Sequence, residues 1–106
     1  YISNTGALSL YQNSVSLGTG TELGQGTTMT LVATTAGSQT GVLENGTRIG
    51  QLKIIAYQTG AHGFVLTPAI ANGWTNITFT ANGQGCTMVW TTAGWICVSS
   101  QGGTVS

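Results

Sequence analysis

The chain has 106 residues, enough for one domain with a modest hydrophobic core. Only 4% of the residues are charged, against about 25% in an average globular protein, and the formal net charge is zero. One Arg and one Lys cannot form the basic patch that binds nucleic acid or an anionic membrane, and no run approaches the roughly 18 apolar residues of a membrane-spanning helix.

The same low charge favours association between copies of the chain. Charged surfaces keep free monomers apart in solution, and this chain has almost no such repulsion. We therefore expect an assembled state. The alternative is a monomer that is hydrated by its many Thr, Ser, Asn and Gln side chains.

Residues 1–26 combine a hairpin pattern with a connector. Apolar and polar side chains alternate within residues 7–18, on either side of Gln12-Asn13. A two-residue turn at that point would gather the apolar side chains on one face. Residues 18–26, rich in Gly and Thr, would then form a flexible connector, or an arm that contacts neighbouring subunits.

The next segment is predicted to form a strand followed by a hairpin. The strand covers residues 27–33, which are rich in Thr and apolar side chains. Asn45-Gly46 is a strong hairpin signal, because both central residues of such a turn need positive φ. The four residues on each side of this turn are expected to pair. Glu44 and Arg48 would then make an exposed contact worth less than about 1 kcal/mol.

Residues 51–57 are the most apolar run of the chain. Apolar side chains occur on both of its faces, with Ile54 on one face and Ile55 on the other. This pattern predicts a central strand or a strand buried in an interface. A further strand is expected over residues 63–67 and should end at Pro68.

The last third of the chain has the clearest strand pattern and contains all three tryptophans. Within residues 74–81, polar and apolar side chains alternate from Asn76 to Thr80, with Ile77 and Phe79 on the apolar face. A final hairpin with its loop at residues 91–94 would place Trp90 opposite Trp95. This aromatic pair could belong to the core, to a subunit interface or to a platform for sugar rings.

That hairpin also determines what the two cysteines can do. Cys86 and Cys97 fall on one face of the sheet but diagonally offset, too far apart for an unstrained disulfide. We expect two free, buried thiols, as suits assembly in a reducing cytosol. Only His62 could join them as a metal ligand, so no metal site is expected.

No catalytic constellation is expected either. The two carboxylates, Glu22 and Glu44, lie in a Gly/Thr-rich connector and beside a tight turn, and they do not suggest an acid–base pair. A Cys–His pair could be drawn from His62 and either cysteine, but strand cysteines without a cationic neighbour are poorly reactive. We therefore predict no enzymatic activity, no catalytic residues and no cofactor.

No segment has a helical period over a useful length, and about nine to ten short strands are expected. We predict a single all-β domain over residues 1–106, a small antiparallel sandwich or barrel-like fold. Six side chains are the candidates for its core or for an oligomer interface: Ile54, Ile55, Phe64, Phe79, Trp90 and Trp95.

Several short patterns in the second half of the chain carry a family resemblance. They are Gly-Gln-x-Lys at residues 50–53, Leu-Thr-Pro at 66–68, Ile-Thr-Phe at 77–79 and a final hairpin with Trp after the turn at 88–98. Together they resemble the small C-terminal β domains of tailed-phage virion proteins, which include capsid decoration (cement) proteins and fibre-like appendages and are commonly trimers. Residues 1–49 are similar to these domains only in the general character of their sequence and contain none of these patterns.

The resemblance implies a non-enzymatic structural protein of a bacteriophage virion, of the capsid decoration type. Such a protein would be assembled in the cytoplasm of the bacterial host and would reside in the virion. Its partners would be further copies of itself in a homotrimer, and the major capsid protein or another virion protein. The alternative is a head- or tail-fibre tip adhesin that binds host surface glycans.

Overall fold

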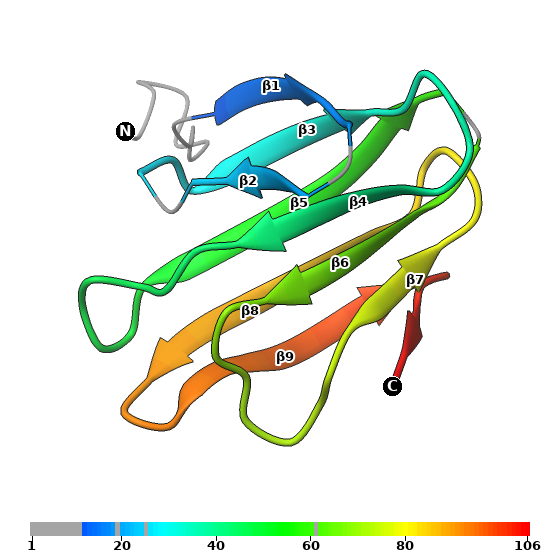
Figure 1. Cartoon of the computed structure of the whole chain (residues 1–106). Helices are drawn as coiled ribbons and strands as arrows, with labels where there is room; N and C mark the ends of the chain where they lie inside the picture. The colour runs from blue at the N-terminus through cyan, green and yellow to red at the C-terminus, as the bar shows by residue number, and fades with distance from the viewer. Residues whose placement is uncertain (1–11, 19, 25, 61) are drawn as a thin grey trace, which may run out of the picture.

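The computed structural model describes residues 12–18, 20–24, 26–60 and 62–106. These residues form ten β-strands and no helix, so none of them belongs to a helix that could cross a bilayer (Figure 1). The all-β prediction and the expected number of strands are confirmed. In chain order the strands are β1 (Gln12–Ser16), β2 (Thr21–Leu23), β3 (Met29–Ala33), β4 (Gln39–Leu43), β5 (Leu52–Thr59), β6 (Phe64–Pro68), β7 (Ile77–Phe79), β8 (Gly85–Thr91), β9 (Gly94–Gln101) and β10 (Thr104–Val105).

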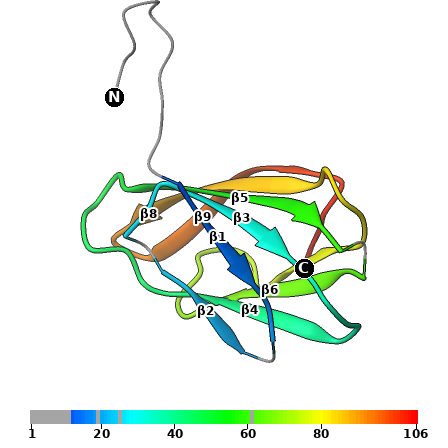
Figure 2. The same ribbon diagram turned by 90° about the horizontal axis from the view of Figure 1, so that it is seen from above.

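The strands form two five-stranded sheets that pack face to face (Figure 2). The first, which we call the β5 sheet, has the strand order β1-β3-β5-β8-β9. The second, the β6 sheet, has the order β10-β7-β6-β4-β2. The predicted sandwich is therefore confirmed, although both sheets mix parallel and antiparallel pairs instead of being purely antiparallel.

The parallel pairs arise because the first six strands alternate between the two sheets. As a result β1, β3 and β5 run parallel in the β5 sheet, and β2, β4 and β6 run parallel in the β6 sheet. A tight turn cannot join parallel neighbours, because the chain must first return to the same end of the sheet. Here it returns through the opposite sheet, which also holds the two layers together.

Two predicted hairpins are wrong for this reason. Gln12 and Asn13 lie inside β1 and not in a turn, and β1 pairs with β3. Residues 7–11, the predicted partner strand, lie outside the described residues. Residues 44–51 cross from β4 in one sheet to β5 in the other, so the Asn-Gly pair within them is not a hairpin turn. The expected Gly/Thr connector includes the short strand β2.

The last four strands run antiparallel to their neighbours. The β8–β9 hairpin has the predicted alignment near its turn, where Trp90 pairs with Trp95. One extra residue in β9 then shifts the alignment, so that Cys86 pairs with Ser100. Both cysteines are free, as predicted; Cys86 is buried and Cys97 is half-buried.

The core lies between the sheets and receives side chains from both. Tyr57 of the β5 sheet packs edge-on against Phe64 of the β6 sheet, with 5.0 Å between ring centroids, and Phe64 packs against Phe79. Complete burial of such a side chain is worth about 1.5–3 kcal/mol. The buried apolar side chains are Leu17, Leu23, Val32, Leu43, Ile55, Tyr57, Phe64, Leu66, Ile77, Phe79, Cys86, Met88 and Trp95.

Candidate assembly surface

The outward side of the β5 sheet carries apolar side chains where a solvated sheet face would carry polar ones. In β5, buried side chains alternate with side chains that point away from the core. Leu52 lies opposite Val89 of β8, and Val89 lies opposite Ile96 of β9, so the three form an apolar row across the sheet. Leu52 and Ile96 are each 38% exposed.

A second set of outward side chains lies beside this row and extends to β3. Ile54 is flanked by Met29 of β3 and by Thr87 of β8. Ala56 lies next to Leu31 of β3 in the same way. The apolar outward side chains of these four strands are called the outer face from here on. They are Met29, Leu31, Leu52, Ile54, Ala56, Val89, Ile96 and Val98.

Val98 lies at the margin of the outer face, at an irregularity in the edge strand β9. Met88 pairs with Cys97 and Thr87 pairs with Ser99, so Val98 is one residue more than β8 can pair. A bulge of this kind bends the strand and redirects the side chain of the extra residue. Val98 is 61% exposed, which makes it the most exposed apolar side chain of the outer face.

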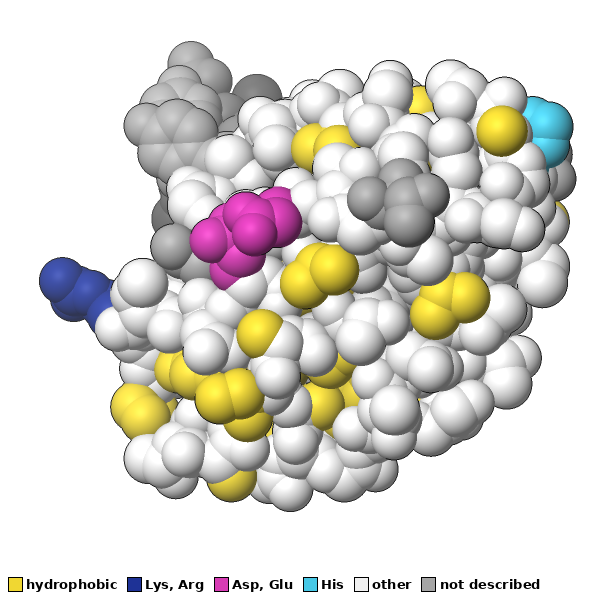
Figure 3. Space-filling view, viewed as in Figure 1, with side chains coloured by type: hydrophobic (Ala, Val, Ile, Leu, Met, Phe, Trp, Pro, Cys, Tyr) yellow, Lys and Arg dark blue, Asp and Glu magenta, His cyan; other side chains and the backbone are white. Residues whose placement is uncertain are grey.

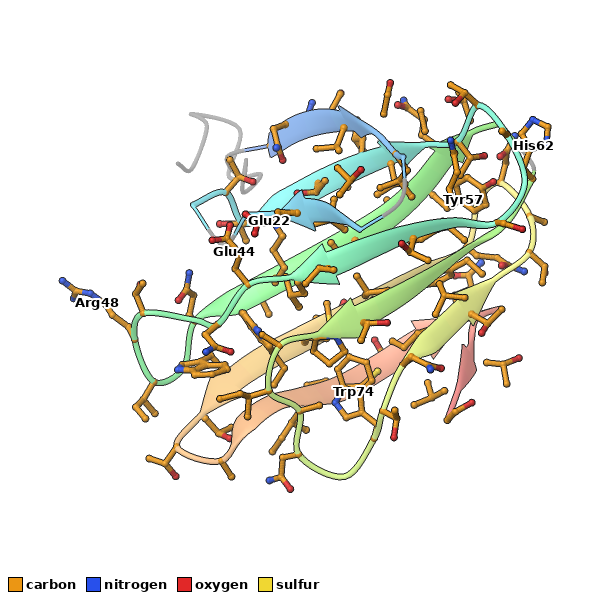
Figure 4. All side chains as sticks on the ribbon, in the orientation of Figure 1. Glu22, Glu44, Arg48, Tyr57, His62 and Trp74 are labelled. Atoms are coloured by element: carbon orange, nitrogen blue, oxygen red, sulfur yellow. The ribbon has the colours of Figure 1, made fainter. Side chains whose placement is uncertain are left out.

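Among the described residues, no charged side chain lies on the outer face. The chain has four charged residues, and each is placed elsewhere. Glu22 points outward from the β6 sheet, Glu44 follows β4, and Arg48 lies in the crossover with its side chain directed away from Glu44 (Figure 4). Lys53 is buried between the sheets. A partner for the outer face therefore has to be uncharged and apolar at the contact.

The outward face of the β6 sheet is different in character. Figure 3 shows this side of the molecule, where hydrophobic side chains appear as patches among backbone atoms and side chains of other types. Threonine and valine alternate across its strands: Thr40 pairs with Val65, and Val65 pairs with Thr78. Threonine hydroxyls can donate hydrogen bonds to water and accept them from it, so this face can remain solvated without a partner.

A buried lysine fixes the segment that leads into β3. The Lys53 ammonium group donates to the carbonyl oxygens of Gly24 at 2.7 Å and Thr27 at 2.9 Å. It also donates to the hydroxyl oxygens of Thr27 and Thr30. Burial lowers the pKa of Lys53 to about 8, against a smaller opposite effect of the Glu44 carboxylate. Because these oxygens satisfy the ammonium group, the cluster serves to hold the strands in place.

The three tryptophans meet at the end of the sandwich where β8 turns into β9. Trp95 is completely buried, and its ring nitrogen donates to the carbonyl oxygen of Glu44 at 2.8 Å. Trp90 packs edge-on against Trp95, with 5.3 Å between ring centroids, and the Trp74 ring nitrogen donates to the Trp95 carbonyl oxygen. Trp95 therefore belongs to the core and cannot form part of a platform for sugar rings.

The six side chains predicted for core or interface fall into two groups. Four lie in the core between the sheets: Ile55, Phe64, Phe79 and Trp95. Ile54 belongs to the outer face, and Trp90 is half-buried. The remaining members of the outer face were not among the predicted residues. The available signal was the run 51–57, whose second apolar face needs a buried surface outside the core.

His62 is not brought together with the other candidate ligands and nucleophiles. It lines an open hollow of about 260 Å³, and neither a cysteine nor a carboxylate is among the lining residues. Burial raises the pKa of the Cys86 thiol to about 12, so this thiol stays protonated and unreactive. Within the described part of the chain, no three His, Cys, Asp or Glu side chains gather as a metal site would require.

Comparison with known proteins adds no relative from which a function could be transferred. No protein-family model matches the chain, and no curated protein matches it. Among the surfaces of the described residues, the outer face is the one whose apolar side chains call for a partner.

Proposed function

We propose that the protein is a non-enzymatic structural component of a bacteriophage virion, of the capsid decoration type. The observation that supports the proposal is the outer face, an apolar and uncharged surface on a protein without net charge. Contiguous exposed apolar patches mark interaction sites on soluble proteins. The resemblance of residues 50–106 to tailed-phage virion domains supplies the setting, with a homotrimer and the major capsid protein as the proposed partners.

Covering the outer face would stabilise both the protein and the assembly that it joins. Val98 keeps 61% of its surface exposed in the single chain, and Leu52 and Ile96 keep 38% each. Full burial of such a side chain is worth about 1.5–3 kcal/mol, so covering these three contributes roughly 2–4 kcal/mol. A partner that binds only the folded protein stabilises it further by mass action. A shell would gain contact area between the subunits that the protein bridges.

Particle stability tests this function. Virions assembled without the protein should release their genome at lower temperature and under milder osmotic shock than complete virions. Purified wild-type protein should restore the resistance, and so should Ile49→Asp, which changes an exposed side chain of the crossover between β4 and β5. Val98→Asp should not restore it, because it places a charge on the outer face. Stripped particles that resist as well as complete ones would refute the decoration role.

A second candidate function is that of a head- or tail-fibre tip adhesin for host surface glycans. It is favoured by Trp74 and Trp90, whose half-buried side chains both contact Trp95. Partly exposed aromatic rings offer an apolar surface with a polar edge, which suits a sugar ring. Binding of the purified protein to host polysaccharide should then be lost in Trp74→Ala and kept in Val98→Asp. Absence of any such binding by the wild-type protein would exclude the adhesin.

A further inference from the structure

Lys53 of β5 and Asn13 of β1 meet inside the sandwich, although β3 lies between their strands. The side-chain oxygen of Asn13 accepts hydrogen bonds from the hydroxyl groups of Thr27 at 2.9 Å and Thr30 at 2.7 Å. The Lys53 ammonium group donates to the same two hydroxyl oxygens, at 3.2 and 2.7 Å. Because both hydroxyl groups bridge the amine and the amide, only the width of a hydroxyl group separates the two.

We propose that the side chains of Lys53 and Asn13 form an isopeptide bond, which joins β5 covalently to β1. The Lys53 nitrogen attacks the amide carbon Cγ of Asn13, and the bond from Cγ to Nδ2 breaks. The proton that the attacking nitrogen loses passes to the departing nitrogen, which leaves as ammonia. One amide replaces another, so the reaction needs no oxidant and no activated co-reactant.

The two threonines prepare the Asn13 amide for attack. Negative charge develops on the carbonyl oxygen of an amide when a nucleophile adds to its carbon, and hydrogen-bond donors aimed at that oxygen stabilise the charge. Thr27 and Thr30 both donate to Oδ1 of Asn13. The Thr30 hydroxyl oxygen also accepts from the lysine nitrogen, so it is placed to receive the proton that this nitrogen loses.

The environment of Lys53 favours the neutral amine, which is the form that attacks. The side chain is completely buried, and its hydrogen-bond acceptors are neutral carbonyl and hydroxyl oxygens. Burial lowers the pKa of Lys53 to about 8, and the Glu44 carboxylate opposes this with a smaller effect. About one tenth of the amine is then neutral at pH 7 and about nine tenths at pH 9. The bond should therefore accumulate slowly near neutral pH and faster at pH 9.

The position of β1 allows the remaining gap to close. β1 is an edge strand of the β5 sheet and pairs with β3 alone, so it can shift toward Lys53 without displacing another strand. The bond would then span β3 and fix the edge strand to the centre of the sheet. It would also close the chain between residues 13 and 53 into a loop, and such a loop restricts the unfolded chain and thereby stabilises the fold.

Trypsin digestion of the denatured protein tests the bond. Arg48 and Lys53 are the only Arg and Lys, so trypsin cuts the free chain into three pieces. An amide on the lysine nitrogen blocks the cut after Lys53 and keeps the two pieces released at Arg48 joined. Wild-type protein after prolonged incubation at pH 9 should remain one species of about the full 10.8 kDa, and its intact mass should fall by one ammonia. Freshly prepared protein, in which the lysine is still free, should give three pieces.

Matched variants assign the bond to its two residues. Lys53→Arg keeps a trypsin site but cannot form the bond, and Asn13→Ala lacks the amide, so both should give three pieces after the same incubation. Gln12→Ala changes the exposed neighbour of Asn13 and should behave as the wild type. Thr27→Val removes one of the two donors to the amide oxygen and should slow bond formation about 100-fold. Circular dichroism shows which variants are folded.

The digestion also separates the bond from other losses of ammonia. Cyclisation at Asn45-Gly46 or Asn82-Gly83 would lower the mass by the same amount, but it would leave the chain open to both trypsin cuts. Three pieces from incubated wild-type protein would overturn the isopeptide bond. A single species from folded Asn13→Ala would overturn the assignment of Asn13. The inference goes beyond the proposed function and stands apart from it, because the bond forms within one chain.

Discussion

At the scale of single residues, the ammonium group of Lys53 connects three strands of the β5 sheet. It lies on β5 and donates to the hydroxyl oxygen of Thr30 on β3 at 2.7 Å. The Thr30 hydroxyl in turn donates to the side-chain oxygen of Asn13 on β1, also at 2.7 Å. An unpaired buried charge would be strongly destabilising, so these bonds are needed to keep Lys53 inside the sandwich.

Lys53→Met should lower the free energy of unfolding by about 2–4 kcal/mol. Met keeps the apolar stem but leaves the carbonyl oxygens of Gly24 and Thr27 without their donor. Urea unfolding measures the change. Arg48→Met is the matched control, because Arg48 is exposed, and it should stay within about 0.5 kcal/mol of the wild type. If the free energy of unfolding falls equally little in both variants, the buried ammonium group is not required for the fold.

The lowered pKa of Lys53 also predicts a dependence of stability on pH. The pKa is about 8 in the folded protein, against an ordinary value of 10.5 that applies to the unfolded chain. Between these values the unfolded chain binds more protons, so raising the pH from 8 to 9 should stabilise the wild type by about 1 kcal/mol relative to Lys53→Met. The pKa values of Cys86 and Cys97 are raised in the folded protein, so these thiols lower its stability as the pH rises. This effect is the same in the wild type and in Lys53→Met and does not change the difference between them. Urea unfolding at each pH gives the difference, and a constant difference would contradict the assignment.

At the scale of elements, the crossover between β4 and β5 is anchored to the tryptophans of the β8–β9 hairpin. Its first residue, Glu44, accepts a hydrogen bond from the Trp95 ring nitrogen. Near its end, the Gly50 amide donates to the Trp90 carbonyl oxygen, and the Trp90 amide donates to the Gln51 carbonyl oxygen. The crossover is therefore fixed to the β8–β9 hairpin, which lies about forty residues later in the chain.

Gly46→Ala should destabilise the protein by about 1–3 kcal/mol, because an added methyl group would overlap the Trp90 ring. Gly46 is not at positive φ, so its backbone accepts Ala and only the clash is tested. Urea unfolding followed by tryptophan fluorescence measures the loss, and near-UV circular dichroism reports the displaced ring. Gly37→Ala, with nothing within 4 Å of the added methyl group, should be close to neutral. Equal stability of the two variants would show that the crossover does not depend on contact with Trp90.

What the sequence can predict here depends on how far apart the interacting residues are. The pairing of Trp90 with Trp95 follows from alternation and a short loop, which are local properties. Met29 instead pairs with Ile54 after the chain has visited the other sheet, and no local pattern encodes that connection. The hydrogen bonds of Lys53 likewise join residues 23 to 29 positions apart. The core faces are therefore predictable, whereas the parallel order, the buried lysine and most of the outer face depend on the tertiary fold.

At the scale of the whole molecule, the low charge of the chain and its neutral outer face both favour association between copies. A face without charge adds no repulsion when two copies meet, and the zero net charge of the chain adds none at longer range. The main change in free energy on association is then the removal of the apolar outer face from water. Folding and association should consequently be coupled, so that protein concentration affects thermal stability.

The unfolding temperature of the wild-type protein should rise by about 3 °C for each tenfold increase in concentration above the dissociation constant of the assembly. The physical reason is mass action, since association removes folded monomer from the unfolding equilibrium and the unfolded chain has no outer face to offer. Differential scanning calorimetry over a hundredfold range of concentration measures the shift. Ile49→Asp should show the same shift, whereas Val98→Asp should unfold at one temperature throughout. A wild-type unfolding temperature that does not change with concentration would mean that the outer face stays in contact with water, and the assembly proposed for it would then be wrong.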